Sequence, residues 1–173
     1  MKKVYIIAAL LTVASVGAFA IWNMAPQTVA VLPDVDKITV RKSARKLELY
    51  HNGKIVKSYT IALGKNPIGH KQMEGDSKTP EGKYFIAYHN PKSSYHLSLK
   101  ISYPDEQDKL NAKKMGVSAG GDIMIHGLPN RAPFFGRFHN LTDWTQGCIA
   151  VNNYEIEEIY AAVKDGTPIE ILP

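Results

Sequence analysis

The sequence predicts one mainly β domain, a sandwich or small barrel with helical decoration. Two apolar runs flank Asn52-Gly53, residues 95–103 alternate between apolar and polar side chains, and an amphipathic helical pattern lies at residues 153–163. A chain of 173 residues is long enough for one hydrophobic core but short for two. Its 45% hydrophobic and 21% charged content is ordinary for a globular protein, and this excludes a collagenous or broadly disordered chain.

The N-terminus predicts export from the cytoplasm. The pair Lys2-Lys3 precedes a long apolar run, and Ala18-Phe19-Ala20 fits the small-x-small pattern of a signal-peptidase site. Residues 1–20 are therefore expected to be a signal peptide. The apolar run continues through Trp22 and is long enough to span a bilayer, so an uncleaved N-terminal anchor is the alternative.

Residues 21–36 contain two prolines and few large apolar side chains, and they are predicted to be a linker. Loss of residues 1–20 would lower the net charge from +5 to +3. This mild positive charge suits a polyanionic surface such as a cell wall, and it equally suits simple solubility. No block of basic residues is interleaved with aromatics, so we expect no nucleic-acid partner.

The first strands are predicted at residues 38–40, 47–50 and 55–63. The last two form a β-hairpin, because Asn52-Gly53 between them tolerates the positive φ angles of a tight turn. Residues 64–83 are dense in Gly, Pro, Lys and acids and lack apolar periodicity. We expect them to form an ordered functional loop around one end of the sheet.

The middle of the chain predicts two more strands and a surface helix. Residues 84–88 form a short strand that Asn90-Pro91 ends, and residues 95–103 form a half-buried strand. Its polar face carries His96, Ser98, Lys100 and Ser102. An acidic start and a lysine-rich end predict a helix at residues 105–115, with Gly116 as its stop.

The C-terminal part predicts one good helix and a final strand. Asn152 or Asn153 can cap the helix, whose apolar side chains recur with helical spacing. Gly166 is the expected stop, and residues 168–172 form the last strand.

The only cysteine, Cys148, follows Thr145-Gln146-Gly147 on a predicted tight turn. It cannot form an internal disulfide, and an unpaired thiol in an exported protein is buried and inert, paired with another chain, or kept for chemistry. A thiol nucleophile needs a nearby base, and donors for the oxygen that becomes negative during acyl transfer. The backbone N–H groups of Gln146, Gly147 and Cys148 are candidates for this oxyanion hole.

A compact strand at residues 122–127 supplies a candidate base, because His126 lies at its end. The aromatic-rich residues 128–144 then form a flap before the cysteine turn. Strand ends joined by such an excursion can lie side by side, which would bring imidazole and thiol together. By itself a strand-end histidine is more often a hydrogen-bonded structural residue.

Two separated motifs resemble the L,D-transpeptidase catalytic domain (YkuD type) of bacterial cell-wall enzymes. One is Ile125-His126-Gly127 followed by Thr145-Gln146-Gly147-Cys148, and the other is the glycine-rich stretch from Gly64-Lys65 to Lys83-Tyr84. The resemblance covers residues 37–173, the expected catalytic domain. It implies a mainly β fold with Cys148 as nucleophile and His126 as general base, while the Gly127 carbonyl orients the imidazole.

The resemblance further implies attack by Cys148 on a peptidoglycan stem peptide, at the carbonyl that joins the diamino acid to D-alanine. D-alanine leaves, and an amine of another stem peptide accepts the acyl group. Gly147 and Cys148 would donate to the oxyanion. Stem peptides are the expected partners, a wall-linked lipoprotein is a further candidate, and the expected location is the periplasm or cell envelope. No cofactor is expected. Contact with a membrane is expected only if the N-terminus is uncleaved.

Two positions depart from the family pattern. Family members usually carry His where this chain has Gln146, and Arg where it has Ala150. His126 is then the only motif imidazole, and a substrate carboxylate lacks its usual partner. The alternatives are a hydrolase on the same Cys–His site, acting as an amidase or carboxypeptidase, and an inactive wall-binding module.

Three further residues are candidates for the substrate cleft: His139 and Trp144 near the flap, and His96 on the polar strand face. The simpler interpretations are a surface histidine, a packed flap aromatic and a side chain that is merely off the core. No cluster of His, Cys and acidic residues has metal-ligand spacing, so we expect no metal.

Overall fold

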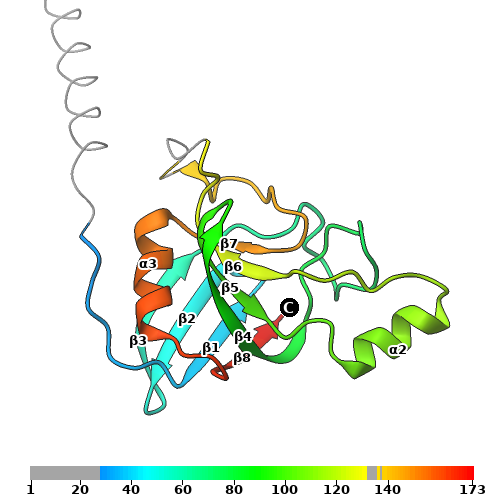
Figure 1. Ribbon diagram of the computed structural model, residues 1–173, viewed down its shortest axis with the longest axis horizontal. Helices are drawn as coiled ribbons and strands as arrows, with labels where there is room; N and C mark the ends of the chain where they lie inside the picture. Colours follow the sequence, from blue (N-terminus) through cyan, green and yellow to red (C-terminus); the bar gives the residue numbers. More distant parts are fainter. Residues whose placement is uncertain (1–27, 132–135, 137) are drawn as a thin grey trace, which may run out of the picture.

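The protein folds as a strongly curled sheet of eight strands with two helices, in a computed structural model that describes residues 28–131, 136 and 138–173 (Figure 1). The predicted signal peptide or anchor, the first residues of the linker and part of the flap lie outside the described residues. The prediction of a mainly β fold is confirmed, and the curled sheet corresponds to the barrel alternative. Neither helix of the described residues is long and apolar enough to span a membrane.

The strands are β1 (Lys37–Arg41), β2 (Lys46–His51), β3 (Lys54–Thr60), β4 (Gly82–Ser93), β5 (His96–Ile101), β6 (Met124–His126), β7 (Ile149–Ala150) and β8 (Pro168–Leu172). They lie in the order β3-β2-β1-β8-β4-β5-β6-β7. Two neighbouring pairs, β1 with β8 and β6 with β7, are parallel. A parallel pair needs a long connection, and the predicted flap is the connection between β6 and β7.

The hairpin predicted around Asn52-Gly53 is present as β2 and β3. Both turn residues have positive φ angles, 51° for Asn52 and 74° for Gly53. The turn therefore uses the conformational freedom on which the prediction rested.

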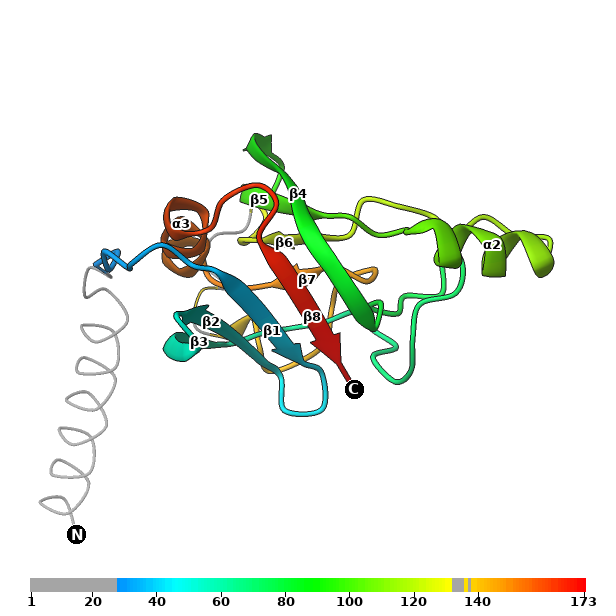
Figure 2. The same cartoon turned by 90° about the horizontal axis from the view of Figure 1, so that it is seen from below.

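The two edges of the curled sheet meet behind the cysteine turn. Ala62, just after β3, exchanges two backbone hydrogen bonds with Ala150 of β7, at 3.0 and 2.8 Å. Lys65 N–H also donates to Thr145 O at 3.0 Å. The segment after β3 and the segment that carries the cysteine turn are thus held together by backbone hydrogen bonds, and Figure 2 shows them side by side.

Strand β4 is longer than predicted, because Asn90-Pro91 does not end it. The pairing of β4 with β5 shifts register between Asn90 and Ser93, and Pro91 lies in this irregular stretch. A proline there removes no regular ladder hydrogen bond, so the strand continues past it.

The two helices are α2 (Glu106–Lys114) and α3 (Asn153–Ala162), at opposite ends of the molecule (Figures 1 and 2). Helix α2 follows its prediction, with Asp105 as N-cap. Asn152 caps α3 in a capping box with Glu155, also as predicted. The predicted stop of α3 at Gly166 is wrong, because Val163 is already extended, with a ψ angle of 140°.

One core fills the inside of the curled sheet. Its fully buried side chains come from both halves of the chain and include Ile38, Leu47, Leu49, Ile61, Ile86, Leu99, Ile125 and Ile149. The described end of the predicted linker is attached to this body, because Ala30 N–H donates to Glu158 Oε1 at 2.8 Å and Val35 N–H to Ala162 O at 2.9 Å.

Candidate active site

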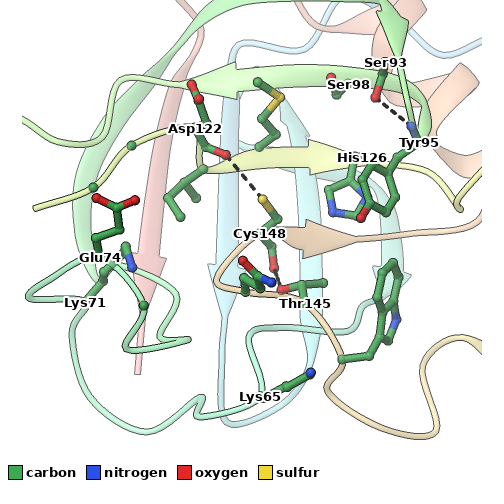
Figure 3. A pocket seen from close by; sticks show the side chains of 17 residues that line it. Lys65, Lys71, Glu74, Ser93, Tyr95, Ser98, Asp122, His126, Thr145 and Cys148 are labelled. Carbon is green, nitrogen blue, oxygen red and sulfur yellow. Dashed lines mark hydrogen bonds between the residues drawn. The ribbon is translucent and has the colours of Figure 1, made fainter.

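A cleft of about 540 Å³ opens at the end of β6 and β7 (Figure 3). Cys148, immediately before β7, and His126, the last residue of β6, both line it. Ile125 is paired with Ile149 and His126 with Ala150 in the parallel ladder, so the two side chains arise from neighbouring strands. The sequence predicted this juxtaposition.

The cysteine turn is fixed by its own threonine. Thr145 Oγ1 donates to Cys148 O at 2.7 Å and accepts from Gly147 N–H at 3.1 Å. The Gly147 N–H is therefore occupied, and it does not point free into the cleft as the predicted oxyanion hole required. The N–H groups of Cys148 and Gln146 remain as candidate donors.

The glycine-rich loop packs directly against this turn. Gly147 has a φ angle of 125°, and a Cβ added there would lie 2.5 Å from Lys78 O. A Cβ added at Gly64 would lie 2.1 Å from Ser77 O and 3.0 Å from the Gly147 Cα. The two sequence motifs thus meet at two glycines, where no larger residue fits.

A partly buried ion pair holds the start of the motif. Arg45 Nη2 donates to Asp143 Oδ2 at 2.6 Å, and Asp143 Oδ1 accepts from Leu63 N–H at 2.9 Å. Thr145 N–H then donates to Leu63 O at 3.1 Å. The cysteine turn is therefore attached to the segment after β3 by side chains as well as by backbone.

The Cys148 thiol is half-buried and donates to the backbone carbonyl of Asp122, with an Sγ–O distance of 3.4 Å. Burial raises the pKa of this thiol. The Met124 N–H and the charges of Lys100 and Lys71 act in the opposite direction, whereas the Asp122 carboxylate adds to the rise. The resting state is a thiol, surrounded by groups that respond to its ionisation.

The His126 imidazole is buried, with only 4% of the residue exposed. Its Nδ1 lies 2.7 Å from Gly127 O, so Nδ1 carries the proton and Nε2 is the basic nitrogen. The Tyr95 and Trp144 rings lie 4.5 and 5.7 Å away between centroids. Burial lowers the pKa of His126 to about 4, so the imidazole is neutral near pH 7.

The imidazole and thiol point into the same cleft without hydrogen-bonding to each other (Figure 3). Catalytic hydrogen bonds are often long in the free enzyme and tighten when substrate binds. The arrangement can therefore supply a nucleophile and a neutral base across a small gap.

The opposite wall of the cleft comes from the glycine-rich loop, which is ordered as predicted. Asp76 accepts hydrogen bonds from Lys71 Nζ at 2.8 Å and from three backbone N–H groups, those of Gln72, Met73 and Lys78. Thr79 Oγ1 accepts from Gly64 N–H at 3.2 Å. Asp76 and Thr79 hold the shape of the loop, and Lys71 and Glu74 face the cleft (Figure 3).

The three further candidates lie in different places. Trp144 lines the cleft, stacked on Tyr95. His96 does not line it and instead pairs with Glu157 of α3, with an Nε2–Oε1 distance of 2.6 Å. His139 is buried rather than at the surface, and neither ring nitrogen has a hydrogen-bond partner among the described residues.

Sequence reasoning missed several lining residues, namely Tyr95, Ser98, Lys71 and Glu74. Ser98 lies on the polar strand face that the sequence predicts, and its pairing with His126 across β5 and β6 places it in the cleft. Tyr95 carried no such signal, because a hairpin tip positions it. In the described part of the chain no group of His, Cys, Asp and Glu is placed to hold a metal ion.

The chain matches the family model of the L,D-transpeptidase catalytic domain over residues 36–171. It is 26% identical, over 178 aligned residues, to YafK of Escherichia coli K12, which carries the name of an L,D-transpeptidase. This match covers 94% of the chain and 64% of YafK.

Two solved structures at similar identity share the fold. Pgp2 of Campylobacter jejuni, described as a helical cell shape determining protein, has a TM-score of 0.62 at 27% identity, over 89% of this chain and 54% of Pgp2. Bd1075 of Bdellovibrio bacteriovorus has a TM-score of 0.54 at 27% identity, over 84% of this chain and 53% of Bd1075. The chain thus spans about half the length of these two proteins.

Proposed function

This chain belongs to the L,D-transpeptidase catalytic domain family, and from that membership we propose that it is an exported enzyme of the periplasm or cell envelope that acts on peptidoglycan stem peptides. Cys148 is the nucleophile and His126 the general base. The observation that carries the proposal is that this thiol and this neutral imidazole open into one cleft from adjacent parallel strands.

In the first half-reaction, His126 Nε2 takes the thiol proton and Cys148 Sγ attacks the carbonyl carbon before the terminal D-alanine. The oxyanion is stabilised by the Cys148 N–H, with Gln146 N–H as second donor. The C–N bond then breaks, and the leaving amine takes the proton from His126. D-alanine departs, and a thioester remains on Cys148.

In the second half-reaction, an amine of another stem peptide attacks the thioester. His126 Nε2 removes a proton from this amine, and the C–S bond breaks. The thiolate then recovers a proton from His126, and the free enzyme is restored. The Gly127 carbonyl supports both steps, because its bond to Nδ1 keeps Nε2 aimed at the cleft.

Hydrolysis is the second candidate, and two observations favour it. Ala150 is fully buried, so it presents no cation to a substrate carboxylate. Gln146 lines the cleft but is not a base. If water replaces the acceptor amine, the enzyme is an amidase or carboxypeptidase, and its substrate is a stem peptide or a stem linked to a wall lipoprotein.

The test is mass spectrometry of the products from defined tetrapeptide muropeptides. Release of D-alanine together with cross-linked dimers is the expected outcome for transfer, whereas trimmed monomers alone would identify a hydrolase.

The Cys148→Ala variant should fold and lose all product formation. Unchanged muropeptides with the intact chain, together with unaltered wall binding by this variant, would instead favour an inactive wall-binding module.

A further inference from the structure

We propose that Lys100 provides the positive charge that stabilises the Cys148 thiolate during acyl transfer, and that Asp122 opposes it. This inference rests on the proposed role of Cys148 as the nucleophile. Lys100 does not line the cleft, so it would act through the electrostatic field and not by touching the substrate.

The sheet register places Lys100 on the same face of the sheet as the Cys148 thiol. Lys100 of β5 is paired with Met124 of β6, and Met124 lies level with Cys148 when the parallel register of β6 and β7 is continued by one residue. Paired residues point to the same face of a sheet. Two strand spacings, about 10 Å, separate the Lys100 and Cys148 backbones.

The Lys100 ammonium makes no ion pair among the described residues, burial lowers its pKa, and the charge of Asp122 acts in the opposite direction without direct contact. Its Nζ donates to Tyr103 O at 2.9 Å, and no carboxylate of the described residues lies within ion-pair distance. Lys71, the other buried cation near the thiol, is already paired with Asp76 at 2.8 Å. A half-buried ammonium paired only with a carbonyl gains most from an anion that forms nearby.

The need for such a charge follows from the histidine. Because burial keeps His126 neutral, no resting imidazolium is available to stabilise a thiolate. The thiol also donates to Asp122 O, which favours the protonated form. Three charged groups act on the thiol pKa, namely Lys71 from the glycine-rich loop, Lys100 from β5 and Asp122 from the segment before β6, and Lys65 and Glu74 also line the cleft. Lys100 and Lys71 favour the ionised form of the thiol, and Asp122 disfavours it.

Because Cys148 is the only cysteine, alkylation of the whole chain by iodoacetamide reports on this thiol alone. Its rate between pH 6 and 10 gives the thiol pKa without any substrate. For Lys100→Gln, which retains a donor but loses the charge, we expect the thiol pKa to rise by about one unit and alkylation at pH 7 to slow roughly tenfold. Lys100→Arg should restore the native value.

Two further variants test the sign of the charge effect on the thiol pKa and its specificity for Lys100. Asp122→Asn should lower the thiol pKa by about half a unit, because it removes the opposing charge. Asn also tolerates the φ angle of 53° that Asp122 adopts. Lys65→Gln removes a cation that lines the cleft and should leave the thiol pKa unchanged.

An unchanged pKa in Lys100→Gln would overturn the inference, and so would an equal rise in Lys100→Arg, which would indicate lost packing. If Lys65→Gln raised the pKa as much, the effect would be general and not specific to Lys100. Should Lys100→Gln fail to fold, Lys100→Met repeats the test with an apolar stem. Failure of D-alanine release in the native protein would instead reject the proposed function, so the two claims fail separately.

Discussion

The two walls of the cleft differ in the charge of their side chains. Around His126, the rings of Tyr95 and Trp144 replace water and leave one backbone carbonyl as partner, so the imidazole is neutral. Across the cleft, the glycine-rich loop contributes Glu74 and the buried ion pair of Lys71 with Asp76, whose carboxylate organises the loop. Burial therefore keeps the imidazole neutral on one side, whereas charged side chains line the other side.

The largest effect should come from the apolar wall. His126→Gln removes the base, and we expect acyl transfer to fall roughly 1,000-fold, measured as D-alanine release. The thiol pKa should hardly change, because the lost imidazole is uncharged. His89→Gln, at a histidine paired with Asp165 away from the cleft, is the matched control and should retain full activity. A large shift of the thiol pKa in His126→Gln would contradict the neutral state of this imidazole.

The charged wall can be tested through its stability. Asp76→Ala leaves Lys71 unpaired and three N–H groups without an acceptor, and should lower the free energy of unfolding by about 3 kcal/mol, measured by urea denaturation. Glu106→Ala, in an exposed pair with Lys109, should cost less than about 0.5 kcal/mol. Equal losses in the two variants would show that the loop is not held by this buried carboxylate.

The pH dependence of the unfolding free energy tests the contribution of Asp76 in a second way. Burial opposes ionisation of Asp76, but the hydrogen bonds from Lys71 and the backbone hold its pKa below the usual value. Its stabilisation is present above the unfolded pKa and is lost as the pH falls through the folded one. This acid-sensitive part of the unfolding free energy should be absent in Asp76→Ala.

A smaller effect is expected at His139, behind the apolar wall. Burial is the main cause that lowers the pKa of His139 from 6.5 to about 4, and the charge of His126 lowers it further. A lowered histidine pKa leaves stability intact above pH 6.5 and reduces it as the pH falls toward 4. His139→Phe should therefore gain about 1–2 kcal/mol over the native protein at pH 5. At pH 8, where His139 is uncharged, the gain should be smaller, and a difference that did not vary with pH would contradict the assignment.

Much of this fold could be predicted, because its signals are local. Asn52-Gly53 fixed the first hairpin through its φ angles, and Asn152 marked the start of α3. The errors also have local causes. Pro91 is tolerated in β4 because a register shift removes the need for its N–H, and α3 ends at Ala162, before Gly166, because Val163 is already extended.

The site was predictable only in part. Cys148 and His126 lie in sequence motifs, so their approach could be expected from the chain order. The loss of Gly147 as an oxyanion donor could not be predicted, because the orientation of the Thr145 hydroxyl decides it. The pairing of Lys100 with Met124 depends on register across β5 and β6, and residues far apart in the chain set that register.

The backbone bridge between Ala62 and Ala150 has a consequence for folding. It joins residues that lie 88 positions apart in the chain, and such non-local contacts are costly to form early because a long loop must close first. The thiol, the turn behind it and the glycine-rich loop beneath it are therefore assembled only when the ring of strands closes. In a chain that is still unfolded, Cys148 has neither the cleft nor His126 beside it, and the two side chains come together only in the finished fold.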